Sequence, residues 1–292
     1  MTGRLIATAL LAAMLVTLSG CFGQGRVTLA TLDTPEAVLV GEIMALQLEN
    51  FGIDVVRGPV YTSLAQLEAG MLAGEFDLSA VFLQDALTGL PSIGEEPVFD
   101  ILLQEEIVNN TLRDVFGYML LEWWHLDARY SMFVREDRDL RLLALSAQAP
   151  RLTLAAPQSF FEGAGGFAHM QEMFGGLDFA RMYVAEPGYP HGGGQPSHGP
   201  GADILVVRGT DNGSWILDAG YAQADGGFSL WPENMLVPLA KEDTIERLPE
   251  VRMVLSAISF NVNNDAFARS LRDIHQGVQT AEQAAYDLIS QR

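Results

Sequence analysis

The chain of 292 residues contains a single cysteine, Cys21. One cysteine cannot form an internal disulfide, so stability must come from packing. Basic residues are also few, because 17 Lys and Arg stand against 37 Asp and Glu, which gives a formal net charge of −20. Phosphate backbones are bound by Lys and Arg, so this balance argues against nucleic acid as a partner. An acidic surface is compatible with attracting cations, with high solubility or with a saline habitat.

The sequence also lacks the short motifs of common catalytic sites. It contains no Gly-x-Ser-x-Gly nucleophile elbow, no phosphate-binding loop and no His-Glu-x-x-His metal motif. These absences disfavour an enzyme, and no residue pattern indicates a cofactor. Hydrophobic residues make up 49% of the chain, which suffices for the core of one large domain or of two lobes.

The N-terminal segment predicts an export signal and a lipid anchor. Arg4 provides a positive charge, and the apolar run Leu5–Leu18 has the length of a signal-peptide core, shorter than a membrane span. Small residues then lead to Cys21, as in a lipobox. We expect a signal peptide over 1–20, lipid on Cys21, a tether over 21–26 and an extracytoplasmic location in the cell envelope. The alternatives are an ordinary cleaved signal peptide and a short membrane helix that happens to contain a cysteine.

Strands and helices alternate in the first third of the chain. Strands are expected at 27–32, 53–56 and 77–82. The first helix should begin after Thr34-Pro35 and end at Gly52, and the second should begin after Ser63 and end at Gly74. This order is typical of an α/β unit with a parallel sheet.

The rest of the chain continues in a mixed pattern. Apolar runs predict further strands at 118–124, 129–134, 151–155, 203–207 and 235–240. Apolar periodicity predicts further helices at 103–117, from 158 onward, and at 167–174, 243–257 and 265–290. Residues 186–202 are rich in Gly, Pro and His, so no regular structure is expected there.

The order of these segments resembles the substrate-binding proteins of osmoprotectant ABC transporters, which capture glycine betaine, choline and related solutes. The segments that carry the resemblance are 28–56, 67–87, 129–136, 152–179, 186–188, 203–212 and 231–248. The resemblance implies an α/β, bilobal periplasmic-binding-protein fold of type II, with two lobes of mixed or parallel sheets flanked by helices. Lobe 1 would comprise 27–120 plus 231–292, and lobe 2 would comprise 121–230. A solute would be enclosed between the lobes and delivered to a membrane permease.

A quaternary ammonium group is bound by aromatic faces, and the carboxylate of a zwitterion by donors such as Arg. Phe82 matches an aromatic position of the family's site, whereas Arg208 stands where the family has a ligand-facing Tyr. Arg208 would suit a carboxylate and repel a bare cation. The candidate ligand-binding residues are Phe82, Gln84, Asp85, Trp123, Tyr130, Arg208, Thr210, Asp211 and Trp231.

Three of the candidates also have a structural interpretation. Trp123 and its neighbour Trp124 are suited to core or hinge packing, and at most one should face the cleft, since strand neighbours point to opposite sides. Phe82 suits a core equally well, and Arg208 could form an ion pair with an acid such as Asp211.

Two other functions remain open at this point. His191 and His198 in the Gly-rich loop at 189–202 could make the chain a metal-binding lipoprotein. Alternatively, the chain could be a sensor or structural lipoprotein on the same fold that feeds no transporter.

Overall fold

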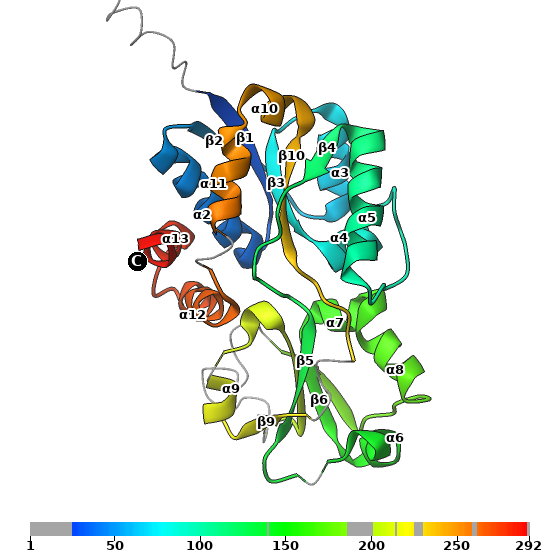
Figure 1. Ribbon diagram of the computed structural model, residues 1–292. Helices are drawn as coiled ribbons and strands as arrows, with labels where there is room; N and C mark the ends of the chain where they lie inside the picture. Colours follow the sequence, from blue (N-terminus) through cyan, green and yellow to red (C-terminus); the bar gives the residue numbers. More distant parts are fainter. Residues whose placement is uncertain are drawn as a thin grey trace, which may run out of the picture.

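The computed structural model describes residues 25–138, 140–185, 201–213, 215–224, 230–258 and 262–290. Within these ranges the strands form two five-stranded sheets, each covered by helices, in two lobes (Figure 1). The predicted α/β class with two lobes of mixed sheets is confirmed. Cys21 and nearly all of the Gly-rich loop, with His191 and His198, lie outside the described residues.

The first sheet has the strand order β2-β1-β3-β10-β4. Its strands are β1 (Arg26–Leu32), β2 (Asp54–Tyr61), β3 (Leu78–Phe82), β4 (Tyr118–Leu120) and β10 (Leu236–Lys241). β1 pairs in parallel with β2 and β3, as the alternating pattern predicts. β10 is antiparallel to β3 and β4. The helices around this sheet are α2 (Pro35–Phe51), α3 (Leu64–Ala73), α4 (Leu83–Gly89), α5 (Ile101–Thr111), α10 (Glu242–Arg247), α11 (Glu250–Ile258) and α13 (Ala281–Ser290).

The second sheet has the order β7-β6-β8-β5-β9. Its strands are β5 (Tyr130–Arg135), β6 (Thr153–Ala156), β7 (Arg181–Val184), β8 (Ile204–Arg208) and β9 (Tyr221–Gln223). β6 is parallel to β7 and β8, and β5 is antiparallel to β8 and β9. Its helices are α6 (Leu145–Gln148), α7 (Gln158–Glu162), α8 (His169–Met173) and α9 (Trp215–Asp218).

Local capping chemistry defines the ends of α2. The Thr34 side chain accepts a hydrogen bond from the backbone N–H of Ala37, and Pro35 occupies the first turn, where its missing N–H costs nothing. Gly52 ends the helix with a left-handed φ of 94°. Ser63 and Gly74 bound α3 in the same way, so both helix predictions are confirmed.

Several predicted elements have different limits in the structure. The helix predicted over 243–257 is broken into α10 and α11, because Pro249 disfavours helical backbone at Leu248. The helix predicted over 265–290 is also two, α12 (Asn264–His275) and α13, separated by a turn at Gly277 with φ 67°. The strand predicted over 118–124 ends at Leu120, where the chain turns toward the second lobe. The short α4, β7 and β9 were not predicted.

Two segments cross between the lobes side by side. Asp127 and Met235 form an antiparallel bridge, and the backbone N–H of Ala128 donates to the carbonyl of Asn234 at 2.9 Å. The side chain of Asn264, at the start of α12, accepts from the N–H of Asp127 and donates to its carbonyl. The two crossing segments and α12 are thus connected by hydrogen bonds.

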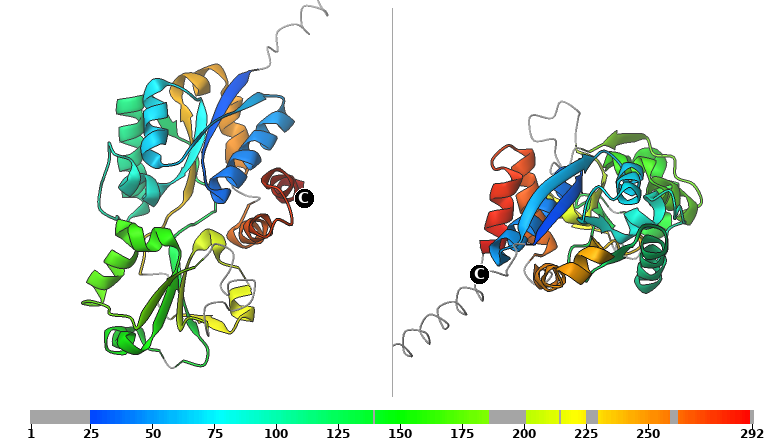
Figure 2. Two further views of the ribbon diagram at one scale, coloured as in Figure 1. Left: turned by 180° about the vertical axis from the view of Figure 1, so that it is seen from behind. Right: turned by 90° about the horizontal axis from the view of Figure 1, so that it is seen from above.

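Helix α12 contacts both lobes (Figure 2). Phe267 and Leu271 pack in the core beneath α2, whereas Ala268 packs with Phe133 and Leu205 of the second sheet. The lobe limits at 120/121 and 230/231 remain a prediction, and α12 is shared by both hydrophobic cores. No helix in the described ranges is long and apolar enough to cross a membrane.

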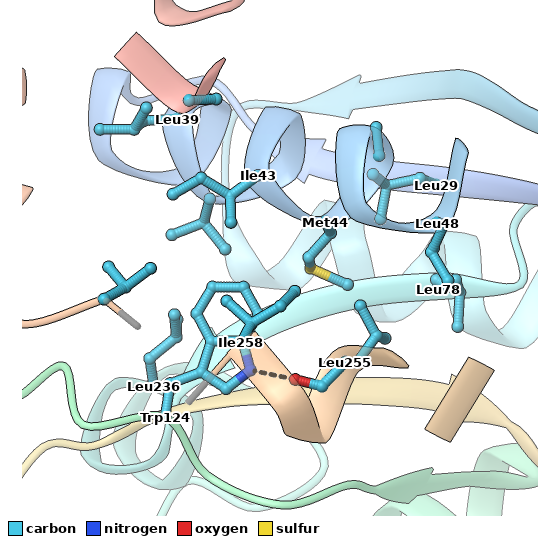
Figure 3. Packing of buried hydrophobic residues seen from close by; sticks show 14 of the residues in the cluster. Leu29, Leu39, Ile43, Met44, Leu48, Leu78, Trp124, Leu236, Leu255 and Ile258 are labelled. Atoms are coloured by element: carbon cyan, nitrogen blue, oxygen red, sulfur yellow. Dashed lines mark hydrogen bonds between the residues drawn. The ribbon is translucent and has the colours of Figure 1, made fainter. Parts of the chain in front are cut away.

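Trp124 anchors the first crossing segment in the core of the first lobe (Figure 3). It is fully buried, packs with residues of α2 and α11, and its indole N–H donates to the carbonyl of Leu255 at 3.1 Å. Trp123 is 37% exposed. The prediction that these neighbours face opposite ways agrees with this difference in burial.

The two tryptophans provide a matched test of this anchor. Trp124→Ala leaves a large cavity and an unpaired carbonyl, so it should reduce the free energy of unfolding by about 3–5 kcal/mol. Trp123→Ala should change it by no more than about 1 kcal/mol. Urea unfolding followed by circular dichroism measures both, and equal losses would contradict the proposed anchoring role.

Candidate functional site

A cavity of about 410 Å³ lies between the two lobes. The first lobe contributes residues after β1 and β3, and the second contributes residues after β6 and β8. Leu271 and His275 of α12 line it as well. Its walls are mainly apolar, and its charged lining residues are Glu36, Asp85, Arg208 and Asp211. The volume is within the range of small-molecule sites.

A second cavity of about 280 Å³ adjoins the first. Leu64, Asp85, Ser159 and Arg208 line both cavities, so these residues separate two chambers of one interlobe cleft. The remaining lining of the second chamber includes aromatic, amide and glycine residues and a second arginine, Arg129, which pairs with Asp127 and Glu233. The aromatic, amide and glycine residues include Gln84, Tyr130, Gly163, Gly165, Gly166, Trp231 and Asn234.

Arg208 connects the two lobes across the cleft. It ends β8, and its side chain is only 13% exposed. Its Nη2 lies 3.0 Å from Oδ2 of Asp85 and 3.4 Å from Oε2 of Glu36, both on the first lobe. The guanidinium carbon is 5.2 Å from the centre of the Phe82 ring. The sequence interpretation as an ion pair is thus confirmed, although its partners are Asp85 and Glu36 instead of the suggested Asp211.

The two carboxylates that face Arg208 lie in the first turns of helices. Glu36 is in the first turn of α2, after β1, and Asp85 is in the first turn of α4, after β3. A helix N-terminus stabilises negative charge. Because β1 and β3 are parallel neighbours, the helices that follow them begin at the same edge of the sheet, which brings the two acids together.

Asn234 on the second crossing segment holds Asp85 in place. It is 4% exposed, and its Oδ1 accepts from the backbone N–H of Gln84 at 2.9 Å. Its Nδ2 donates to Oδ1 of Asp85 at 2.9 Å. A single amide thereby caps α4 and leaves the other oxygen of Asp85 for Arg208.

Thr210 and Asp211 follow Arg208 in a short helical turn. The buried hydroxyl of Thr210 donates to Oε1 of Glu36, which adds another contact between the lobes. Asp211 lines the first cavity. Burial and the nearby negative charge of Glu36 raise the pKa of Asp211 to about 7, although Arg208 acts in the opposite direction.

An aromatic cluster forms the wall of the second chamber. Tyr130 and Trp231 meet edge to face with ring centres 6.1 Å apart, and Phe160 lies 5.7 Å from Trp231. The hydroxyl of Tyr130 donates to Oγ of Ser159 at 3.1 Å. Trp231 is 2% exposed, and its indole N–H has no hydrogen-bond partner among the described residues.

The structure brings eight of the nine predicted ligand-binding residues to the cleft or directly behind it. Phe82, Asp85, Arg208 and Asp211 line the first chamber. Gln84, Tyr130 and Trp231 line the second chamber, together with Asp85 and Arg208. Thr210 lies behind the first chamber, where it bonds to Glu36. Trp123 lines neither chamber.

Sequence reasoning missed Glu36, Ser159 and Asn234. Glu36 was considered only as a first-turn acid of a helix, although its position after a parallel strand also marks the edge where sites form. Asn234 has no local sequence signal, because its partners are 149 and 150 residues away. In the described ranges, no group of three or more His, Cys, Asp or Glu residues is arranged to hold a metal ion.

Comparison with known proteins identifies the fold. No family model and no curated protein matches the sequence. Among solved structures, a glycine betaine/carnitine/choline ABC transporter protein is similar at a TM-score of 0.71 and 14% identity, covering 90% of this chain and 97% of that one. Apo YehZ from Escherichia coli is similar at a TM-score of 0.67 and 17% identity, and the match covers 92% of this chain and 98% of that one. Lactococcal OpuAC in complex with glycine betaine is similar at a TM-score of 0.58 and 14% identity, and the match covers 91% of this chain and 95% of that one.

At these identities the likeness shows the fold, and it confirms the fold resemblance predicted from the order of segments. The chain therefore has the bilobal fold of periplasmic-type binding proteins, and the cavities described above lie between its lobes.

The titration of Asp211 gives a pH test of this site. Folded Asp211 keeps its proton up to a pH of about 7, whereas the unfolded residue loses it near pH 4. Between these values the folded state binds more protons, so raising the pH lowers the free energy of unfolding. Asp211→Asn removes this loss and should become more stable relative to the wild type as the pH rises from 4 to 7.

Thermal unfolding across that pH range measures the difference between the two proteins. Asp218→Asn, at an exposed carboxyl group on α9, is the control and should stay parallel to the wild type. If the melting temperatures of Asp211→Asn and the wild type change with pH in the same way, the pKa of Asp211 is not raised by burial beside Glu36.

Proposed function

We propose that this protein captures a small polar solute between its two lobes, outside the cytoplasm, and delivers it to the permease of an ABC importer. The observation that carries the proposal is the interlobe cleft itself, whose lining comes from both lobes of a binding-protein fold. A solute that contacts both lobes stabilises the closed arrangement over the open one. In this function no bond is made or broken.

The two crossing segments are the proposed hinge. They are connected by backbone hydrogen bonds, and the side chain of Asn264, which bonds to the backbone N–H and carbonyl of Asp127, links them to α12. Oδ1 of Asp127 also accepts from the backbone N–H of Asn234 at 3.1 Å, the same residue that positions Asp85. The proposed hinge and the cleft lining are therefore connected through one residue, Asn234, whose backbone bonds to Asp127 and whose side chain bonds to Asp85.

The proposed solute is a betaine-like zwitterion that carries a quaternary amine. Groups of both signs line the first chamber, since Arg208 faces Glu36, Asp85 and Asp211. Arg208 can contribute to binding the solute's carboxylate, while the aromatic and apolar walls suit its methylated ammonium group. The similar structures include a glycine betaine/carnitine/choline ABC transporter protein, OpuAC in complex with glycine betaine, and a choline-binding protein in complex with choline.

Lipid attachment at Cys21 would hold the protein beside its permease. The lipobox Leu18–Cys21 supports this proposal, and two acyl signals suffice for stable anchoring. The first described residue leads directly into β1 at the far end of the first lobe from the second lobe (Figure 1). An anchor there leaves the cleft unobstructed by the membrane.

A solute screen tests the proposed function. The full chain in mild detergent is heated with glycine betaine, carnitine, choline, proline or zinc, and unfolding is followed by intrinsic fluorescence. A solute that binds only the folded state adds about 2.7 kcal/mol at one hundred times its dissociation constant. We expect a saturable rise with a zwitterion that is lost in Phe82→Ala and kept in Trp123→Ala.

The other outcomes select the alternatives. A rise with zinc alone would favour the metal-binding lipoprotein, whose His-bearing loop lies outside the described residues. No rise with any solute would favour a sensor or structural lipoprotein, in which Arg208 holds the lobes together unaided.

The anchor has its own test. In a bacterial host the wild-type chain should fractionate with membranes, and Cys21→Ser should not acquire lipid or be processed by the same route. Mass spectrometry of the mature N-terminus distinguishes the two forms. An unmodified Cys21 in the wild type would exclude lipid anchoring.

A further inference from the structure

Three groups of the first lobe have the chemistry of a site for an organic cation. Phe82 presents an aromatic face, and Asp85 and Glu36 provide carboxylates at the starts of α4 and α2. Aromatic faces attract cations through their negative π-surface, and carboxylates add charge. These three residues, called the acid-aromatic site below, belong to one edge of the first sheet.

The acid-aromatic site already contains a cation, and that cation comes from the opposite lobe. The Arg208 guanidinium lies 5.2 Å from the Phe82 ring centre, 3.0 Å from Asp85 and 3.4 Å from Glu36. It therefore has the same three contacts that a free organic cation would seek there. Its side chain is 13% exposed and that of Glu36 is 19% exposed, whereas that of Asp85 is 39% exposed, so water screens the contact with Asp85 more than the contact with Glu36.

We propose that the guanidinium of Arg208 is a built-in occupant of the acid-aromatic site, which holds the lobes together without solute and keeps free organic cations out. Arg208 is thereby a specificity-determining residue. A solute with only a positive charge must displace it, whereas a zwitterion can enter beside it and offer it a carboxylate. The inference concerns the empty protein, so it does not depend on which solute the protein transports.

The surroundings of Arg208 favour this occupancy. The two carboxylates of Asp85 and Glu36 face one guanidinium, and the half-buried Asp211 lines the same chamber. Thr210, two residues along, bonds to Glu36 and adds a second link from the same turn to the first lobe. The backbone of this turn is also fixed at the hinge, because the N–H of Gly209 donates to the carbonyl of Arg129 at 2.9 Å.

Removing the side chain should convert the occupied site into an open one. In Arg208→Ala the acid-aromatic site loses its cation and keeps Phe82, Asp85 and Glu36. Tetramethylammonium is a suitable probe, because it is a cation with no hydrogen-bond donor and no carboxylate. We expect it to raise the melting temperature of Arg208→Ala saturably, by roughly 5–10 °C at one hundred times its dissociation constant. The melting temperature of the wild type should change no more than it does with sodium chloride at the same concentration.

Methylguanidinium provides a second probe with the missing group itself. At millimolar concentration it should raise the melting temperature of Arg208→Ala but not that of the wild type. Small-angle X-ray scattering should show a larger radius of gyration for Arg208→Ala than for the wild type. The radius should return toward the wild-type value with methylguanidinium, because the lobes regain their bridge.

Arg57→Ala is the matched control. Arg57 also pairs with two carboxylates, Glu42 and Glu49, but these lie within the first lobe and away from the cleft. The melting temperature of this variant should respond to both probes as that of the wild type does, and its radius of gyration should equal the wild-type value. If Arg208→Ala does not fold by circular dichroism, Arg208→Met keeps the apolar stem and is tested with tetramethylammonium and by scattering in its place.

Two results would overturn the proposal. Tetramethylammonium could stabilise the wild type as strongly as the variant, which would show that Arg208 does not keep cations out. The variant could instead bind neither probe and keep the wild-type radius, which would show that the guanidinium neither fills a cation site nor holds the lobes. Because no transported solute is used, neither result depends on the outcome of the solute screen.

Discussion

The buried guanidinium of Arg208 between Asp85 and Glu36 is the interaction on which the arrangement of the cleft depends. A charge removed from water must be paired, and here both partners are supplied by the opposite lobe. The position of one lobe relative to the other is therefore coupled to the pairing of these charges. The same side chain separates the two chambers, so it also determines how much space a solute finds.

The rest of the first lobe serves to place the two acids. Parallel pairing of β1 and β3 brings two helix starts to one edge, and Asn234 fixes Asp85 from the crossing segment. Trp124 anchors the other crossing segment in the core beneath α2. A rigid edge and two anchored crossings are what the proposed hinge requires, because the proposed closure must bring the same groups together each time.

In the proposed function, the charges of the cleft also define the contacts that a solute must make. It must either leave the Arg208 bridge intact and use Asp211, the aromatic wall of the second chamber and the apolar walls, or replace the bridge with contacts of its own. Either route gives a ligand differential contacts in the open and closed states, which is the physical requirement for ligand-driven closure. A zwitterion can pair with the arginine and with the acids of the cleft at the same time, whereas a simple cation can pair only with the acids.

The sequence by itself determined the local structure: the caps Thr34 and Ser63, the stops Gly52 and Gly74, and the parallel opening unit, because their partners lie within a few residues. It also placed Phe82, Asp85 and Arg208 at strand ends. It could not show that Arg208 pairs with Asp85, which lies 123 residues away, or that Thr210 reaches Glu36 across 174 residues. The breaks within the C-terminal helices do have local signals, Pro249 and Gly277, which the apolar periodicity did not reveal. The sharing of α12 between two cores has no such signal. Only tertiary structure decided these contacts, because long-range pairing depends on how two sheets and two crossings meet, which no local pattern records.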